Sequence, residues 1–115
     1  MTEVEIEGVR FKFAKLPGRS GMRLAARVVK LLGPLMADAN DGDMGAAMAA
    51  LATADENDVL GIADILGPVS QIEFEPGKWA HLDARSQDTH FAGKPKLFLS
   101  WIGHAVKDQL SDFFA

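Results

Sequence analysis

The stretch from Lys94 to Ala115 constrains the fold most, because it has the pattern of one long amphipathic helix. Pro95 suits the first helical turn, where its missing N–H would have no partner inside the helix. The apolar residues after it recur at spacings of three and four, which predicts a single apolar stripe: Leu97, Phe98, Trp101, Ile102 and Ala105. We expect most of this stripe to be buried within its own domain.

The N-terminal residues predict two short strands, or one strand broken at Gly8. Apolar side chains alternate there with charged ones at a period of two, from Val4 to Phe13, as in a half-buried strand. The first half is acidic and the second half is basic, so the two halves suit cross-strand ion pairs in a hairpin.

Three more helices are predicted before residue 68. Ser20 is a plausible N-cap for the first helix, and Pro34 should kink or end that helix near Gly33. Asp43 can cap a second helix that contains Met44, Met48 and Leu51 at helical spacing. The segment Thr53–Glu56 fits a capping box for a third helix, which Gly67 and Pro68 would end.

The remaining segments complete the predicted fold. Gln71–Glu75 alternates as a strand does, and Trp79–Gly93 is polar enough to be a loop that contains one short strand at most. At 115 residues the chain has the size of one domain. We therefore predict a single α+β domain over residues 1–115, mainly helical. About four helices would pack with a small antiparallel sheet formed by the N-terminal strands and the mid-chain strand.

Nothing in the sequence forms a catalytic, metal or cofactor site. The chain has no cysteine and three histidines, which lack the close paired spacing of a zinc site. The acidic loop Asp38–Asp43 fails the calcium-loop pattern, because a glycine at loop position six would place alanines at positions one and three. Phosphate-binding and nucleophile-elbow glycine motifs are also missing. The sequence predicts a protein that is not an enzyme and that has no cofactor.

Charge is divided unevenly along the chain, whose net charge is −4. Seven basic residues lie in the first thirty positions, whereas positions 31–77 hold nine carboxylates and no Lys, Arg or His. The basic segment and the acidic segment could attract each other within one chain, or between copies arranged head to tail. Alternatively, both are ordinary solvated surface. Four basic residues have the spacing of one helix face that could bind nucleic acid: Arg19, Arg23, Arg27 and Lys30. The net negative charge of the chain disfavours that function. No apolar run is long enough to span a membrane.

The end of the last helix is the best candidate for binding a partner. Leu110, Phe113 and Phe114 lie where little chain remains to cover them, and exposed aromatic residues are common at protein interfaces. Methionines of the second helix adapt to varied surfaces. The predicted partner-binding residues are therefore Leu97, Trp101, Leu110, Phe113, Phe114, Met44 and Met48.

The order of these parts resembles the tail assembly chaperones of long-tailed bacteriophages and prophages. The similarity extends over nearly the whole chain and includes Leu31–Leu35, His90–Lys94, Trp101 and the closing Asp112–Phe114. Members often have Asn-Phe or Asn-Tyr and then Gly-Asp-Phe-Phe at this end, and here Gln109–Ser111 departs from that pattern.

The resemblance implies a small, mainly helical, non-enzymatic protein of the host cytoplasm that is absent from the mature virion. Such proteins bind the tape-measure protein and keep it soluble until the tail tube polymerises. Self-association and a longer form made by ribosomal frameshifting are also implied, while binding to nucleic acid or membrane is not expected. The alternative function is a structural or adaptor component of the tail, in tail completion or head–tail joining.

Overall fold

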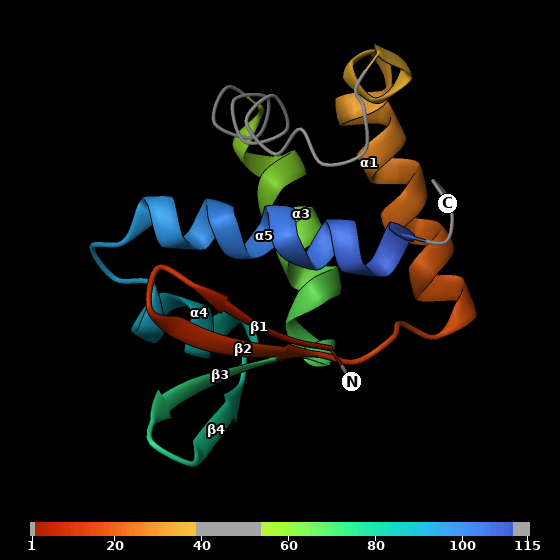
Figure 1. The fold of residues 1–115 in the computed structure, drawn as a ribbon. Coiled ribbons are helices and arrows are strands. Elements are labelled where there is room, and N and C mark those ends of the chain that lie inside the picture. The colour runs from red at the N-terminus through yellow and green to blue at the C-terminus, as the bar shows by residue number, and fades with distance from the viewer. Residues whose placement is uncertain (1, 39–53, 112–115) are drawn as a thin grey trace.

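The computed structural model describes residues 2–38 and 54–111, which form an antiparallel sheet and a group of helices. In chain order the elements are β1 (Thr2–Ile6), β2 (Val9–Phe13), α1 (Gly18–Asp38), α3 (Glu56–Leu66), the short 3-10 helix η1 (Gly67–Val69), β3 (Ser70–Glu75), β4 (Lys78–His81), α4 (Ala84–His90) and α5 (Pro95–Leu110). The α+β class is as predicted. The second predicted helix, which contains Met44 and Met48, lies outside the described residues. Figure 1 shows α1, α3 and α5 on one side of the molecule, with the β3–β4 hairpin projecting from the other.

The predicted N-terminal hairpin is confirmed, and its charges face each other as expected. Glu5 pairs with Arg10 and Glu3 with Lys12 across β1 and β2. A tight turn joins the strands, in which Glu7 and Gly8 both have positive φ, 51° and 82°. A two-residue turn of this kind matches the twist of a hairpin.

The sheet has one strand more than the three predicted for it, and the added strand overlaps the segment in which one short strand was allowed. Its order is β1-β2-β3-β4, with every neighbouring pair antiparallel. The mid-chain strand joins the N-terminal strands in one antiparallel sheet, as predicted, and it pairs with β2 through Phe11 opposite Ile72. The added strand β4 arises because Gly77, at a φ of 76°, turns the chain back beside β3.

Two helix boundaries differ from the sequence prediction. Of the two alternatives predicted at Pro34, a kink or an end near Gly33, the end is wrong, since α1 continues to Asp38. Pro34 lacks an N–H and so removes one hydrogen bond, while the bonds on either side of it can hold the helix together. The N-cap of α3 is two residues later than the predicted Thr53: Asp55 accepts a hydrogen bond from the Asn57 N–H at 2.8 Å, and the helix begins at Glu56.

Helix α4 was not predicted, because it carries almost no apolar periodicity. Asp83 caps it by accepting a hydrogen bond from the Ser86 N–H at 2.9 Å. Its buried side chain is the polar Gln87, whose Nε2 donates to the carbonyl oxygens of Leu82 at 2.8 Å and Ala63 at 3.3 Å. This amide therefore ties α4, the end of β4 and α3 together.

An aromatic cluster joins the sheet to α5. Phe91 stacks on Phe11 of β2, with ring centroids 6.4 Å apart, and on Trp101 of α5, at 5.4 Å. Phe98 completes the cluster at 4.9 Å from Phe91. The predicted apolar stripe of the last helix thus forms the centre of the core, and Trp101 is fully buried in it.

Candidate partner-binding surface

The outer face of α1 exposes two large apolar side chains. Met22 is 63% exposed and Val29 is 57% exposed, whereas Leu24 and Val28 of the same helix are fully buried. Val29 is seven positions after Met22, which is close to two helical turns, so both side chains lie on the same side of α1. We call Met22 and Val29, with the exposed Ala26 between them, the α1 stripe.

Cations flank the α1 stripe. Arg19, Arg23 and Lys30 are exposed beside it, and Arg19 and Arg23 line a shallow depression with Gly18 and Met22. Among residues 2–38 and 54–111, the ion pairs are formed by other cations on the sheet, the linkers and α5. Apolar side chains flanked by cations can receive an amphipathic segment that carries carboxylates.

Helix α3 presents the opposite charge next to α1. Leu60 is 42% exposed, and the exposed carboxylates Glu56 and Asp64 lie on the same helix. The two helices meet where Arg27 lies over Gly61: a Cβ placed on Gly61 would be 2.6 Å from the Arg27 Nη1. The helical side of the molecule therefore has a basic half and an acidic half side by side.

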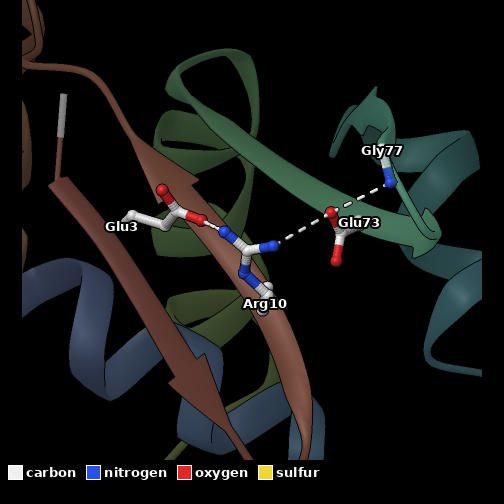
Figure 2. Close-up of polar contacts among 4 residues, drawn as sticks. All are labelled: Glu3, Arg10, Glu73 and Gly77. Carbon is white, nitrogen blue, oxygen red and sulfur yellow. Dashed lines mark hydrogen bonds and ion pairs between the residues drawn. The ribbon is translucent and has the colours of Figure 1, made fainter.

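The outer face of the sheet is occupied by its own ion pairs. Arg10 of β2 reaches Glu3 of β1 on one side and Glu73 of β3 on the other, where Nη1 and Oε2 are 3.3 Å apart. Figure 2 shows that Glu73 also accepts a hydrogen bond from the Gly77 N–H, at 3.2 Å. A network that already satisfies its charges offers a ligand less than do the cations of α1, which form no ion pair with other residues in the ranges 2–38 and 54–111.

The same sheet face carries Trp79, which is covered by a cation. Lys12 Nζ lies 3.9 Å from the centre of the indole ring, within cation–π distance. Trp79 is part-buried as a result. This tryptophan is thus part of the sheet surface rather than an open stacking platform.

The structure places three of the predicted partner-binding residues in the core. Leu97 is 5% exposed, Trp101 is 0% and Leu110 is 3%. A partner can touch these side chains only if α5 leaves the domain, so on the folded chain they act in packing. Phe113, Phe114, Met44 and Met48 lie outside the described residues.

The end of α5 is anchored beside the start of α1. The Gln109 amide accepts a hydrogen bond from the Leu16 N–H at 3.0 Å and donates one to the Ala14 carbonyl at 2.6 Å. Lys15 pairs with Asp108 at 3.6 Å. The linker between β2 and α1 is therefore held against the last turn of α5.

The predicted partner-binding residues did not include Met22, Val29 or Leu60, because apolar side chains at helical spacing are equally typical of a core. The residues around Met22 in the sequence do indicate that its side chain is exposed. With 3.6 residues per turn, Met22 falls on the same face as Ala26, beside Arg19 and Arg23, and away from Leu24 and Val28. A fourth exposed apolar residue, Phe74 at 47%, lies at the end of β3 next to the His90 ring.

Neither metal chemistry nor membrane insertion is supported by the described parts of the chain. Across residues 2–38 and 54–111, no three potential ligands gather closely enough to hold a metal ion. His104 is occupied by its own helix, with Nδ1 2.8 Å from the Ser100 carbonyl oxygen. The helices in these ranges are not both long and apolar enough to cross a bilayer.

Comparison with known proteins agrees with a binding role. No curated protein and no solved structure matches the chain. A family model does match, over residues 7–115, and its description is phage tail assembly chaperone protein, TAC. The match includes all four helices and three of the four strands described above. This chain therefore belongs to the phage tail assembly chaperone family.

Proposed function

We propose that this protein binds the tape-measure protein during tail assembly and keeps it soluble until the tail tube polymerises around it. Membership of the tail assembly chaperone family supports the general role. A long helical client exposes apolar stripes that must be covered reversibly, so a chaperone needs an accessible apolar surface of modest size. We expect the complex to form in the host cytoplasm and the chaperone to be absent from the finished particle.

The observation that carries this proposal is the exposure of the α1 stripe on an otherwise well-packed domain. Met22 and Val29 are more than half exposed, although fully covering such side chains is worth roughly 1.5–3 kcal/mol each. The cations Arg19, Arg23 and Lys30 beside them favour a client helix whose apolar seam is bordered by Asp and Glu. Such pairing gives orientation and a faster encounter more than it gives affinity, which suits a client that must later be released.

The residues after Ser111 extend this proposal. Gln109 holds the last turn of α5 against the linker that precedes α1. We propose that Phe113 and Phe114 add client contacts. Met44 and Met48 are kept in the proposal as a further adaptable surface.

Co-purification with the tape-measure protein tests the α1 stripe. The double variant Met22→Glu/Val29→Glu should retain the fold, because both side chains are solvent-exposed, and should recover at least about tenfold less client, since 1.4 kcal/mol of lost contact is a tenfold change. The matched control is Phe74→Glu, which changes an exposed apolar residue at the sheet end and should leave recovery unchanged. Equal recovery with both variants would reject the α1 stripe as the client surface.

Mass spectrometry of purified virions separates the chaperone from a structural tail component. An assembly chaperone leaves before the particle is complete, so its peptides should be missing from virions and abundant in infected-cell lysate. Recovery of the chain at a fixed ratio to tail proteins would instead favour a role in tail completion or head–tail joining.

A further inference from the structure

Strand β4 forms an accessible edge of the sheet. The strand order places β1 and β4 at the two edges. Helix α5 packs against β1, whereas Figure 1 shows the β3–β4 hairpin projecting away from α1, α3 and α5. An edge strand presents main-chain N–H and C=O groups that can pair with another extended chain. The edge at β4 is therefore the better place for such pairing.

The hydrogen bonds between β3 and β4 identify the main-chain groups of β4 that face outward. The Leu82 N–H donates to the Ser70 carbonyl oxygen at 3.0 Å. In an antiparallel ladder, hydrogen-bonded residue pairs alternate with pairs that are not bonded. Trp79 and His81 therefore belong to pairs that are not bonded, so their N–H and C=O groups point away from β3. Within residues 2–38 and 54–111, no main-chain group beyond the sheet bonds to these four groups.

A cation without a carboxylate partner lies on the outer face beside β4. Lys12 Nζ is 3.9 Å from the centre of the Trp79 ring, and it forms no ion pair with other residues in the ranges 2–38 and 54–111. The carboxylates of Glu73 and Glu75, on the neighbouring strand, are already paired with an arginine and a lysine. A strand added at β4 with a carboxylate beside Trp79 therefore meets the ammonium group of Lys12.

The inner face of the same edge is apolar. Ala80 is part-buried and packs against the core, so the residue opposite it on an added strand should be apolar. Strand β1 already has this chemistry at the other edge of the sheet. Its Glu3 and Glu5 are exposed, and Val4 between them packs against the core. An alternation of acidic and apolar residues thus suits this sheet.

We propose that the β4 edge binds an extended segment of another protein, in which acidic residues alternate with apolar ones. Antiparallel pairing places one acidic residue opposite Trp79, the next opposite His81, and an apolar residue between them opposite Ala80. Main-chain hydrogen bonds give affinity and the alternate side chains give specificity, as in other strand additions. Strand β1 of a second copy is not the occupant, because it is paired with β2 of its own sheet.

NMR titration of the 15N-labelled full-length chain with the peptide Val-Glu-Val-Glu-Val-Glu-Val tests the site. Amide shift changes should centre on residues 78–82 and saturate with a Kd below about 1 mM. The counterpart peptide with lysine in place of glutamate should bind at least about threefold more weakly, because it opposes Lys12. Absence of shifts at residues 78–82 with about 2 mM of the glutamate peptide, or equal binding of both peptides, would overturn the proposal.

N-methylated peptides separate strand pairing from general attraction. Only alternate residues of an antiparallel strand bond to a given neighbour, so the glutamate N–H groups face β4 and the valine N–H groups face away. Methylation of the glutamate nitrogens should weaken binding at least about tenfold, because it removes several hydrogen bonds. Methylation of the valine nitrogens should leave the affinity within about twofold. Equal affinities of the two methylated peptides would refute strand addition at β4.

Variants of the chain place the contacts. His81→Pro removes one outward N–H, a position at which edge strands tolerate proline, and should weaken the glutamate peptide about fivefold. Lys12→Gln should weaken it about threefold, while Lys107→Gln, at an exposed lysine of α5, is the matched control and should bind as wild type does. Wild-type affinity in both His81→Pro and Lys12→Gln, each with native circular dichroism, would overturn the site. The assay contains no tape-measure protein, so its outcome is independent of the proposed function.

Discussion

Replacing Gly67 by alanine tests how closely the helical layer is fitted to the sheet. Gly67 follows α3, and its backbone is in the ordinary right-handed region, with φ at −53°, so no conformational need for glycine exists there. The constraint is space. A Cβ at this position would lie 2.3 Å from the Leu82 carbonyl oxygen and 2.9 Å from the Gln87 Nε2.

The cost can be estimated from these neighbours. The Leu82 oxygen belongs to the backbone and must move roughly 1 Å to reach a normal contact distance. Overpacking of this kind costs about 1–3 kcal/mol. The movement also loosens the 2.8 Å hydrogen bond that Gln87 donates to that oxygen, for about another 1 kcal/mol. We expect a total near 3 kcal/mol, which lowers the melting temperature of a domain of this size by about 10 °C.

Thermal unfolding followed by circular dichroism measures the effect, and Gly21→Ala is the matched control. Gly21 lies within α1, and a Cβ there would meet nothing within 4 Å. Because alanine favours a helix over glycine by about 1 kcal/mol, this control should melt a few degrees higher. A Gly67→Ala protein that melts at or above the wild-type temperature would show that the reasoning about this contact is wrong.

Three other predictions concern stability and the tryptophans. Gln109→Ala removes both hydrogen bonds to the linker before α1 and should cost about 2 kcal/mol in urea unfolding; a loss under 0.5 kcal/mol would contradict the anchoring. Arg10→Ala should cost at most about 1 kcal/mol, because its ion pairs are exposed, and an effect unchanged by salt would argue against that reading. Acrylamide should quench the fluorescence of wild type through the part-buried Trp79 and hardly quench Trp79→Phe, whose remaining Trp101 is fully buried; strong quenching of the variant would place Trp101 at the surface.

The sequence was sufficient to predict elements whose pattern depends on local chemistry. Alternation from Val4 to Phe13 predicted the short strands, and their acidic and basic halves favoured a hairpin with facing charges, which Glu5 opposite Arg10 now shows. Pro95 and the stripe that includes Trp101 predicted α5 and its burial. In both cases each side chain's environment follows from the period of one element.

Prediction failed for elements that are stabilised by contacts with residues distant along the chain. Helix α4 begins with a good cap at Asp83, but its buried residue is Gln87, whose polar amide is satisfied only by carbonyl groups distant along the chain. Strand β4 follows a turn and pairs with β3 although it has little apolar alternation. Neither contact can be read from local periodicity.

The candidate site was the least predictable part, for the same reason. Met22 and Val29 have the chemistry of core residues, and only the positions of α3 and α5 leave their side of α1 uncovered. Conversely, Leu110 was expected near a free end and is buried, because Gln109 and Lys15 fasten the last turn of α5 to the domain. Periodicity identifies an apolar face but not which part of it the rest of the fold covers.

The soluble fraction of the tape-measure protein, measured when it is produced together with this chain, tests the central claim most directly. With wild type or Phe74→Glu, the tape-measure protein should remain in the supernatant after centrifugation. With Met22→Glu/Val29→Glu at equal expression, it should pellet as it does when produced alone. A tape-measure protein that is equally soluble with all three versions, or insoluble with all three, would contradict the claim that the α1 stripe keeps it in solution.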